Sequence, residues 1–400
     1  MKNFGRIFTL AALCAVILGS CIKEQAYKLE TAQLNVNVTR AVSQTQEQGD
    51  QINDIAVWAF KCTIGENGMP VVANDELATG YNHVSNLTDT YQSVALHVPL
   101  PVCDNETQDY MVIAVVNESA FGELSTGALD AHTPYGTLLK ATFSAPNVMN
   151  SHPNENGTTP TVMPVSNWAV ITVNGSASAN TNTHPDNCYN LELPVYRAVA
   201  KTQLYFSKSS DKFDVTISDA RIVSDYNINK GFLLSACKPT GEGAEGVVGT
   251  SMYGYPNQTA GPQWFATATS YGAHDIVLKN NSSNTFTEKS ITATGEEYDW
   301  VGSAFLYESV GVYDYDAAQM DGFKSVPQNE DMDADNGYYL QVTYSIGSET
   351  ATRYVPLPQV VRNHDYQIKA SVDKAVTGDV KIIYEVTPWS VNEIDVPSFE

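Results

Sequence analysis

The chain has 400 residues, enough for two or three domains, and 43% of them are hydrophobic, which is enough to form buried cores. Only 17% are charged, the formal net charge is −23, and tyrosine occurs 22 times. A strongly acidic surface repels nucleic acid and anionic membranes, so nucleic acid is excluded as a partner. Low charge together with many Tyr, Thr, Val and Asn residues is typical of an all-β extracellular protein.

The N-terminus has the pattern of a secretory signal peptide. Lys2 and Arg6 give a positive start, and residues 7–18 form an apolar run that is too short to cross a bilayer as a helix. The following Leu-Gly-Ser leads into Cys21 and resembles a bacterial lipobox, in which the cysteine thiol is acylated before cleavage. We therefore expect a signal peptide at 1–20 and lipidation of Cys21, with an ordinary signal peptide and an incidental cysteine as the alternative.

Residues 32–40 alternate between apolar and polar side chains, and a period of two predicts a half-buried strand. The strand ends at Arg40, and residues 41–51 have the composition of a loop. A basic residue at such a junction is typical of a protease-sensitive site, which places a candidate cut between Arg40 and Ala41. The apolar members of the alternation are Ala32, Leu34, Val36 and Val38.

Further strand patterns continue along the chain, separated by segments rich in Asn, Asp, Gly and Pro. Residues 111–116 are apolar on both faces and are expected in the centre of a sheet. Residues 120–129 are expected to form a short helix. The other predicted strands lie near residues 52–60, 94–100, 213–223, 276–279, 300–308, 338–346, 351–357, 366–373 and 380–387. Predicted loops are 144–163, 174–187, 238–262 and 280–298. This spacing is typical of two β-sandwich domains that meet near residues 198–210.

The C-terminus combines a strand with a second extended segment. Alternation over residues 380–387 predicts the strand, and Pro388 and Trp389 interrupt it. The segment that follows carries three apolar residues among polar ones, and two ordinary edge strands would give the same pattern. These three residues are Val391, Ile394 and Val396.

Four cysteines remain after the lipid site, in a chain expected to be secreted into an oxidising compartment, so one or two disulfides are expected. Their pairing stays open. They are Cys62, Cys103, Cys188 and Cys237.

Motifs for catalysis or metal binding are not found, so we expect neither an enzyme nor a cofactor or metal site. The seven histidines form no HxxxH or HxH pair, and there is no CxxC, nucleophile elbow, P-loop or dinucleotide fingerprint. Asp331, Asp333 and Asp335 resemble the start of a calcium loop. However, Gly337 is one place late and Val342 stands where the bidentate Glu is needed, so a solvated acidic loop is favoured.

Three short motifs follow one another along the chain: YRAVAK at residues 196–201, VRNHDY at 361–366 and YEVTPW at 384–389. Together with the lipobox and the strand ending in Arg40, they resemble the fimbrillin family, the lipoprotein-derived subunits of Bacteroidetes-type (type V) pili. Residues 196–201 resemble an R-x-V-A-K strand found in the middle of that family's chains. Residues 361–366 resemble its R-N-x-x-Y turn into a late strand, and residues 384–389 resemble its V-x-P-W near the end.

The resemblance implies an all-β fold of two tandem transthyretin-like β-sandwich domains, with an N-terminal removable strand and a C-terminal donor-strand tail. It implies that an arginine-specific protease cuts between Arg40 and Ala41 and that a neighbouring subunit fills the gap by strand addition. The residues removed would be Leu34, Val36 and Val38, and those supplied would be Val391, Ile394 and Val396, alone or with the strand at 380–386. The implied segments are a signal peptide (1–20), a lipidated propeptide (21–40), two sandwiches (41–200 and 201–387) and a tail (388–400).

The implied function is that of a fimbrial (pilus) shaft subunit that polymerises by donor-strand exchange and supports adhesion. Its partners would be further copies of the chain in a head-to-tail homopolymer, the protease, accessory fimbrial subunits and an anchor. The precursor would be held at the outer membrane by its lipid and would then enter the extracellular fimbrium. Two alternatives stay open. One is a non-polymerising surface lipoprotein that binds glycans through aromatic residues such as Trp264, Trp300 and Trp389, and the other is an accessory or tip fimbrillin.

Overall fold

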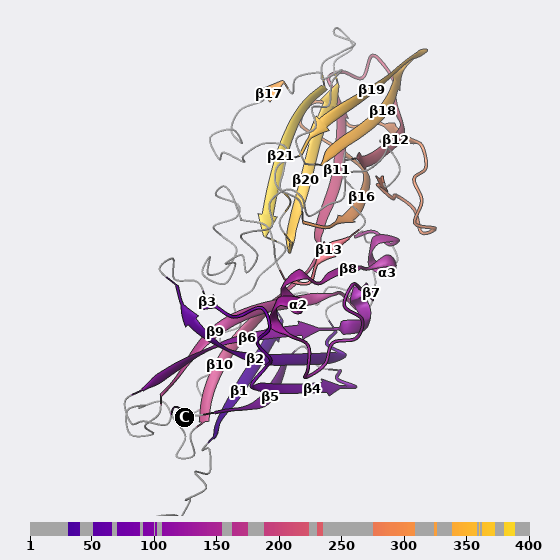
Figure 1. Cartoon of the computed structure of the whole chain (residues 1–400). Helices are drawn as coiled ribbons and strands as arrows, with labels where there is room; N and C mark the ends of the chain where they lie inside the picture. The colour runs from indigo at the N-terminus through magenta and orange to yellow at the C-terminus, as the bar shows by residue number, and fades with distance from the viewer. Residues whose placement is uncertain are drawn as a thin grey trace, which may run out of the picture.

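The chain forms two β-rich lobes stacked end to end, and a computed structural model shows their arrangement (Figure 1). As composition predicted, the described part of the chain is mostly β-structure. Within it, no helix has the length and hydropathy needed to span a bilayer. The structure describes residues 31–40, 51–65, 70–88, 91–99, 101, 106–153, 162–174, 188–223, 230–234, 275–308, 324–325, 338–357, 360, 362–372 and 380–388. The predicted signal peptide, Cys21 and Ala41 lie outside these residues.

The N-terminal lobe is one folded sheet in the strand order β3-β2-β6-β9-β10-β1-β5, with β4 also paired to β2. Its central strand β6 pairs with β2 on one side and β9 on the other, which confirms the central position predicted for residues 111–116. The strands are β1 (Thr31–Arg40), β2 (Asp54–Ile64), β3 (Pro70–Val71), β4 (Gly80–Ser85), β5 (Tyr91–Pro99), β6 (Thr107–Val116), β9 (Val165–Asn174) and β10 (Cys188–Arg197).

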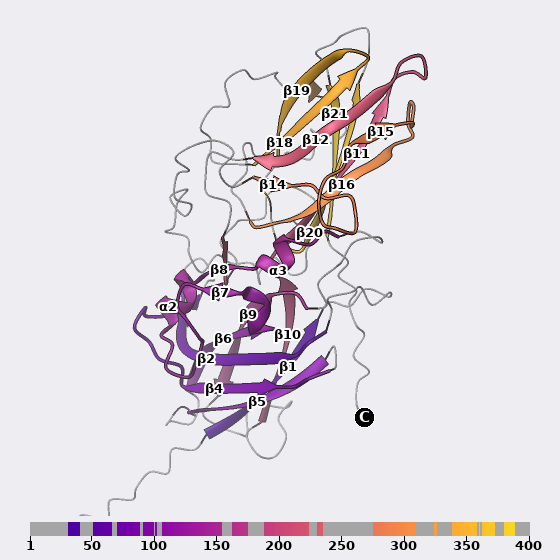
Figure 2. The same cartoon turned by 90° about the vertical axis from the view of Figure 1, so that its right-hand side faces the viewer.

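This sheet folds over on itself at β9 and β10, which share only two residue pairs. The strands on either side of that corner face each other, and their apolar side chains form one buried cluster. The sheet's other end also comes together, because β4 and β5 run side by side (Figure 2). There the Asn82 side chain donates a hydrogen bond to Ala95 O at 2.9 Å. A Cβ at Gly80 would lie 2.8 Å from His97 O, so only glycine allows this close approach.

A small three-stranded sheet in the order β13-β8-β7 and three short helices lie between the lobes. The helix predicted at 120–129 is wrong: a 3-10 helix ends at Phe121 and strand β7 follows. Gly122 explains the break, because its φ is 68° and a Cβ there would lie 2.1 Å from Ser144 O. The elements are η1 (Glu118–Phe121), β7 (Glu123–Leu124), α2 (Tyr135–Lys140), β8 (Thr142–Ser144), α3 (Pro146–Met149) and β13 (Gly231–Phe232). Helix α3 lies within the stretch that was predicted to be loop at 144–163.

The C-terminal lobe is a pair of sheets that enclose a second buried cluster. One has the order β16-β11-β20-β21-β17, and the other has the order β14-β12-β18-β19, with β15 also paired to β12. The strands are β11 (Ala200–Lys208), β12 (Val215–Val223), β14 (Ile276–Val277), β15 (Lys289–Ile291), β16 (Asp299–Leu306), β17 (Lys324–Ser325), β18 (Tyr339–Ile346), β19 (Glu349–Pro356), β20 (His364–Val372) and β21 (Val380–Pro388). Strand β15 lies in the predicted loop at 280–298.

The chain passes from the first buried cluster to the second between Val199 and Ala200. Four of the described residues are exceptions, because they follow Ala200 in the chain but pack into the N-terminal cluster: Leu233, Leu234, Phe305 and Tyr307. Tyr307 makes edge-to-face contact with Phe143, with ring centroids 5.4 Å apart. The two lobes therefore share apolar contacts and are not joined by the chain alone.

Gly122→Ala should lower the free energy of unfolding by several kcal/mol, whereas Gly127→Ala should lower it by only about 1–2 kcal/mol. Both glycines have positive φ values, 68° and 74°, so both variants carry backbone strain, and at Gly122 the ψ of −126° adds to it. At Gly127 a Cβ meets nothing within 4 Å, and only at Gly122 does it collide with the β8 backbone. Urea unfolding of both variants would measure the difference, and equal losses would contradict the close packing at Gly122.

Candidate functional site

Strand β1 is the middle strand of a three-stranded segment and not an edge strand. It runs parallel to β10 over eight residue pairs, from Gln33 to Arg40, and antiparallel to β5 over nine pairs, from Thr31 to Thr39 (Figure 1). Strand β1 comes early in the sequence, and its parallel partner β10 follows about 155 residues later. Taking β1 out would leave unpaired backbone groups on both neighbours.

The inward face of β1 is part of the core of the N-terminal lobe. Ala32, Leu34, Val36 and Val38 are each 0% exposed and belong to the N-terminal buried cluster. They are surrounded by buried residues of both neighbouring strands, namely Val94, Leu96 and Val98 of β5 and Leu193 and Val195 of β10. The structure thus confirms the prediction, made from the alternation in the sequence, of which face of β1 is buried.

The outward face of β1 carries a row of amide side chains that hydrogen-bond along the strand and across to β10. Gln33 Nε2 donates to Asn35 Oδ1 at 2.8 Å, and Asn35 Nδ2 donates to Asn190 Oδ1 at 3.0 Å. Asn37 Nδ2 donates to Glu192 Oε1 at 2.6 Å. Sequence reasoning missed Asn190 and Glu192, because the strand pattern shows which positions face outward but not which residue of a distant strand lies opposite.

The C-terminal side of β1 carries the candidate cut. Arg40 is the last residue of β1 and pairs with Val195 of β10, beyond the last residue paired with β5. Ala41 lies outside the described residues. At the other end of the chain, β21 pairs with β20 over nine residues and with β17 over two. Val391, Ile394 and Val396, the predicted donor residues, lie outside the described residues.

Of the four cysteines, Cys62 is a buried free thiol near the end of β2. Burial raises the pKa of this thiol to about 12, and the charge of Asp109 adds to the shift. A thiol with so high a pKa is almost entirely protonated at neutral pH and is a poor nucleophile. Cys103 and Cys237 lie outside the described residues, so the disulfide pairing remains a prediction that is not tested.

Two of the motifs found in the sequence meet where the lobes join. The resemblance implied a strand at residues 196–201, whereas in the structure β10 ends at Arg197, the chain bends at residues 198–199, and β11 begins at Ala200. The motif therefore crosses from one lobe to the other. The predicted turn before a late strand is confirmed, because β20 begins at His364 and Asn363 has a φ of 60°. The two motifs touch through a hydrogen bond from Asn363 N to Val199 O at 2.9 Å.

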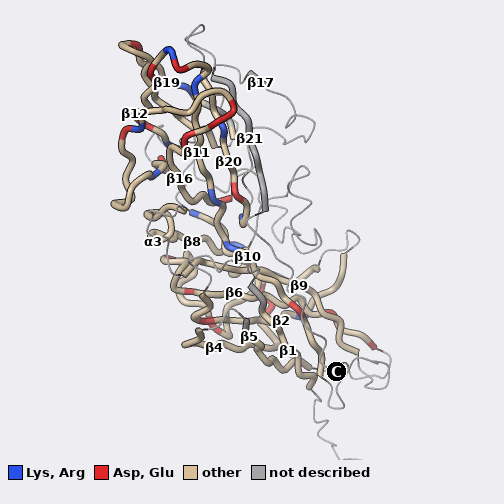
Figure 3. Tube along the Cα trace, turned by 180° about the vertical axis from the view of Figure 1, so that it is seen from behind, with Lys and Arg blue, Asp and Glu red and all other residues tan. Residues whose placement is uncertain are grey.

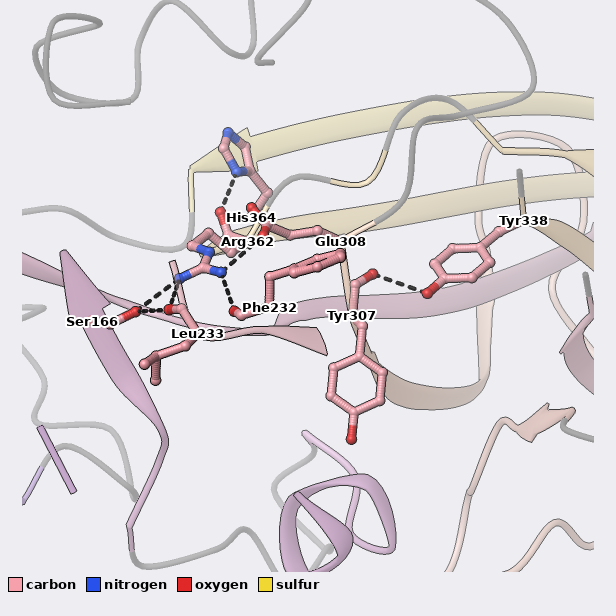
Figure 4. Close-up of polar contacts among 8 residues, drawn as sticks. All are labelled: Ser166, Phe232, Leu233, Tyr307, Glu308, Tyr338, Arg362 and His364. Atoms are coloured by element: carbon pink, nitrogen blue, oxygen red, sulfur yellow. Dashed lines mark hydrogen bonds and ion pairs between the residues drawn. The ribbon is translucent and has the colours of Figure 1, made fainter. Parts of the chain in front are cut away.

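Arg362, which begins that turn, is the centre of a buried polar cluster (Figure 4). Its side chain is only 2% exposed and forms a 2.8 Å ion pair with Glu308, whose side chain is 1% exposed. It also donates to Ser166 Oγ at 2.9 Å and to the carbonyl oxygens of Phe232 at 2.7 Å and Leu233 at 3.2 Å. Ser166 belongs to β9 of the N-terminal lobe, so one side chain links both lobes through four acceptors.

A second polar contact between the lobes lies beside α3. Lys279 is buried and donates from Nζ to Met149 O and, at 3.1 Å, to Ser151 O. Burial lowers the pKa of this lysine to about 8. Next to it, the His152 ring hydrogen-bonds to Asn281 O at 3.0 Å, and burial lowers the pKa of His152 as well. Trp300 stacks on that ring, with centroids 6.3 Å apart.

The packing of Trp300 bears on the glycan-binding alternative, because a ring held against His152 is part of the contact between the lobes. Trp264 and Trp389 lie outside the described residues, as do Asp331, Asp333 and Asp335 of the acidic loop. Among the residues that are described, no group of three or more His, Cys, Asp and Glu side chains is placed to hold a metal ion. The most distinctive feature of the described chain is thus the buried first strand.

Glu308→Ala should lower the free energy of unfolding by about 3–5 kcal/mol, because it leaves the Arg362 guanidinium buried without a counter-ion. The control is Asp275→Asn, which weakens a partly exposed pair with Arg221, 3.3 Å apart, and should cost about 1 kcal/mol or less because Arg221 has a second partner. Arg221 keeps its pair with Asp219 in that variant. Chemical denaturation would compare the two, and a loss at Glu308 no greater than that at Asp275 would show that the buried pair does not hold the lobes together.

No protein-family model and no curated protein sequence matches the chain. Among solved structures, the chain is similar to the tip fimbrial protein Mfa3 from Porphyromonas gingivalis, with 11% identity, a TM-score of 0.46, and coverage of 90% of this chain and 100% of that one. A fimbrial protein from Bacteroides vulgatus gives 10% identity, a TM-score of 0.43, and coverage of 89% and 99%. The fimbrial anchor protein Mfa2 from Porphyromonas gingivalis gives 7% identity, a TM-score of 0.37, and coverage of 90% and 99%. With TM-scores below 0.5, all three are distant likenesses.

Proposed function

We propose that this chain is the precursor of a structural subunit of a bacterial fimbria, a shaft subunit that polymerises after a protease removes its first strand. The observation that carries this proposal is β1 itself. It is a middle strand whose inward face is fully buried, it is the first strand of the described residues, and it ends at an arginine. The resemblance of the sequence motifs to fimbrillins is a second, independent support.

Loss of β1 would remove a large share of the stability of the N-terminal lobe. Burial of a Val or Leu side chain contributes about 1.5–3 kcal/mol, so Leu34, Val36 and Val38 together contribute roughly 5–9 kcal/mol. That is comparable to the whole stability of a typical domain, about 5–15 kcal/mol. A chain without β1 would also present two bare strand edges, which are templates for pairing with another chain. Such a chain has a strong drive to take up a replacement strand.

The replacement in this proposal comes from the C-terminus of a second copy. Val391, Ile394 and Val396 would supply the apolar side chains, alone or with β21, whose apolar residues also alternate. Insertion of one copy's end into the next copy's lobe does not close on itself, so it builds a head-to-tail filament. Before the cut, β1 is attached to the same chain and outcompetes any neighbour through its high effective concentration.

The other parts of the proposal concern the precursor and its surroundings. Lipid on Cys21 would hold the precursor at the outer membrane until an arginine-specific protease cuts between Arg40 and Ala41. The cut would release the anchor and β1 together, and the subunit would join an extracellular fimbrium with accessory and anchor subunits. In this proposal residues 41–200 and 201–387 are two transthyretin-like sandwich domains.

Arg40→Ala should leave a monomeric lipoprotein on the cells. An arginine-specific protease then finds no arginine before Ala41, so β1 stays attached and in place. N-terminal sequencing should find no chain that starts at Ala41, and an unboiled gel should show no ladder. Arg40→Lys is the matched control, since it keeps the positive charge and should still resist this protease. Normal filaments from the Ala variant would contradict the proposal.

Deletion of residues 389–400 should allow the cut but stop polymer growth, because the subunit keeps its groove and loses its donor segment. The deletion starts after Pro388 since that residue belongs to β21. A shorter deletion of residues 397–400 keeps Val391, Ile394 and Val396 and should still polymerise. Ladders on unboiled gels of cut protein would report growth. A ladder from the longer deletion would show that the tail is not the donor, and would favour β21 in that role.

A further inference from the structure

The groove that β1 fills has one charged position on its outer rim. Charged residues are sparse along β1 and β5, as Figure 3 shows. The β5 residues opposite the outward side chains of β1 include His97, Ala95 and Ser93. On β10 the corresponding residues are Cys188, Asn190, Glu192 and Pro194. Any strand that occupies the groove in this register must therefore place one outward side chain directly opposite the acidic Glu192.

The inward face favours one register of such a strand through the burial and the sizes of its side chains. A slip of one residue turns every apolar side chain outward and is strongly disfavoured. A slip of two residues keeps the apolar side chains inward, but it moves Ala32 to the place of Leu34 and leaves that buried place underfilled. The outer face of β1 does not detect this slip, because Asn35 moves to the place of Asn37. For a strand with an outward carboxylate the outer face does add discrimination, since Glu192 is charged and Asn190 is not.

We propose that Asn190 and Glu192 form a register key that selects the strand occupying the groove. The inference rests on the proposed function, since it concerns any strand that replaces β1. The fitting ligand is an extended peptide parallel to β10 whose side chain opposite Glu192 donates a hydrogen bond, as Asn37 does at 2.6 Å. A carboxylate at that position meets Glu192 directly across the two strands and is rejected, because like charges facing each other destabilise strand pairing.

The position opposite Asn190 has a different preference. An amide can donate as well as accept, so Asn190 can turn its NH2 group toward a carboxylate that replaces Asn35. The same Asn-to-Asp change should therefore be tolerated at Asn35 and rejected at Asn37, although the two residues are two positions apart on one exposed face. Glu192→Gln keeps an acceptor for Asn37 and removes the charge, so it should abolish the rejection.

The first test uses the uncut chain and hydrogen exchange of the backbone amides of β1. Asn37→Asp should raise the opening equilibrium of β1 by about three- to tenfold, and Asn35→Asp by less than about twofold. In the double variant Asn37→Asp with Glu192→Gln, the opening should return to within about twofold of Glu192→Gln alone, and high salt should shrink the effect of Asn37→Asp. Equal effects of the two Asp variants, or an effect that survives Glu192→Gln, would overturn the register key.

The second test uses the full chain cut after Arg40, so that β1 is held without a covalent bond. A labelled peptide with the sequence of residues 31–40 should exchange into the groove. The peptide with Asp at position 37 should compete about three- to tenfold more weakly, and the peptide with Asp at position 35 nearly as well as the original. Equal competition by both acidic peptides would overturn the register key alone. Failure of the original peptide to exchange would overturn strand replacement itself, and with it any role of the key in choosing a replacement.

Discussion

The structure of the N-terminal lobe depends on the double pairing of β1, which is hydrogen-bonded to β10 on one side and to β5 on the other. A middle strand holds its neighbours apart at the spacing of a sheet, and its side chains close the core below it. Because β1 and β10 are about 155 residues apart in the chain, this part of the sheet is completed only after nearly half of the chain has been made. The lobe is thus assembled around a strand that comes from a distant part of the chain and is held by its two ladders and its buried side chains.

The C-terminal lobe has the same local arrangement with a different anchor. There β20 runs parallel to β11, the strand that follows the crossing, and antiparallel to β21, just as β1 runs parallel to β10 and antiparallel to β5. In the C-terminal lobe the middle strand follows directly after Arg362, whose buried side chain binds groups from both lobes. The second middle strand is therefore held by a buried polar anchor as well as by its two ladders.

Much of this arrangement could be predicted from the sequence, because strands with one buried face show a period of two. The pattern located β1, β12 and β21, and the doubly apolar run at 111–116 gave the central strand β6. The sequence did not show the corner between β9 and β10, because a corner depends on which strands pair and not on local alternation. It also did not show that Asn190 and Glu192 lie opposite Asn35 and Asn37. The helix expected at 120–129 failed because Gly122 serves a close contact with a distant strand.

The junction around Arg362 has a mechanical consequence for any fibre built from this chain. Tension along such a fibre passes through each subunit from lobe to lobe, across residues 198–199 and across a buried ion pair flanked by Tyr307 and Phe143. Hydrogen bonds and apolar contacts on several sides of the crossing resist bending as well as stretching. A subunit of this kind would therefore bend less than two lobes joined by residues 198–199 alone, and more of the applied force would reach the buried contacts between its lobes.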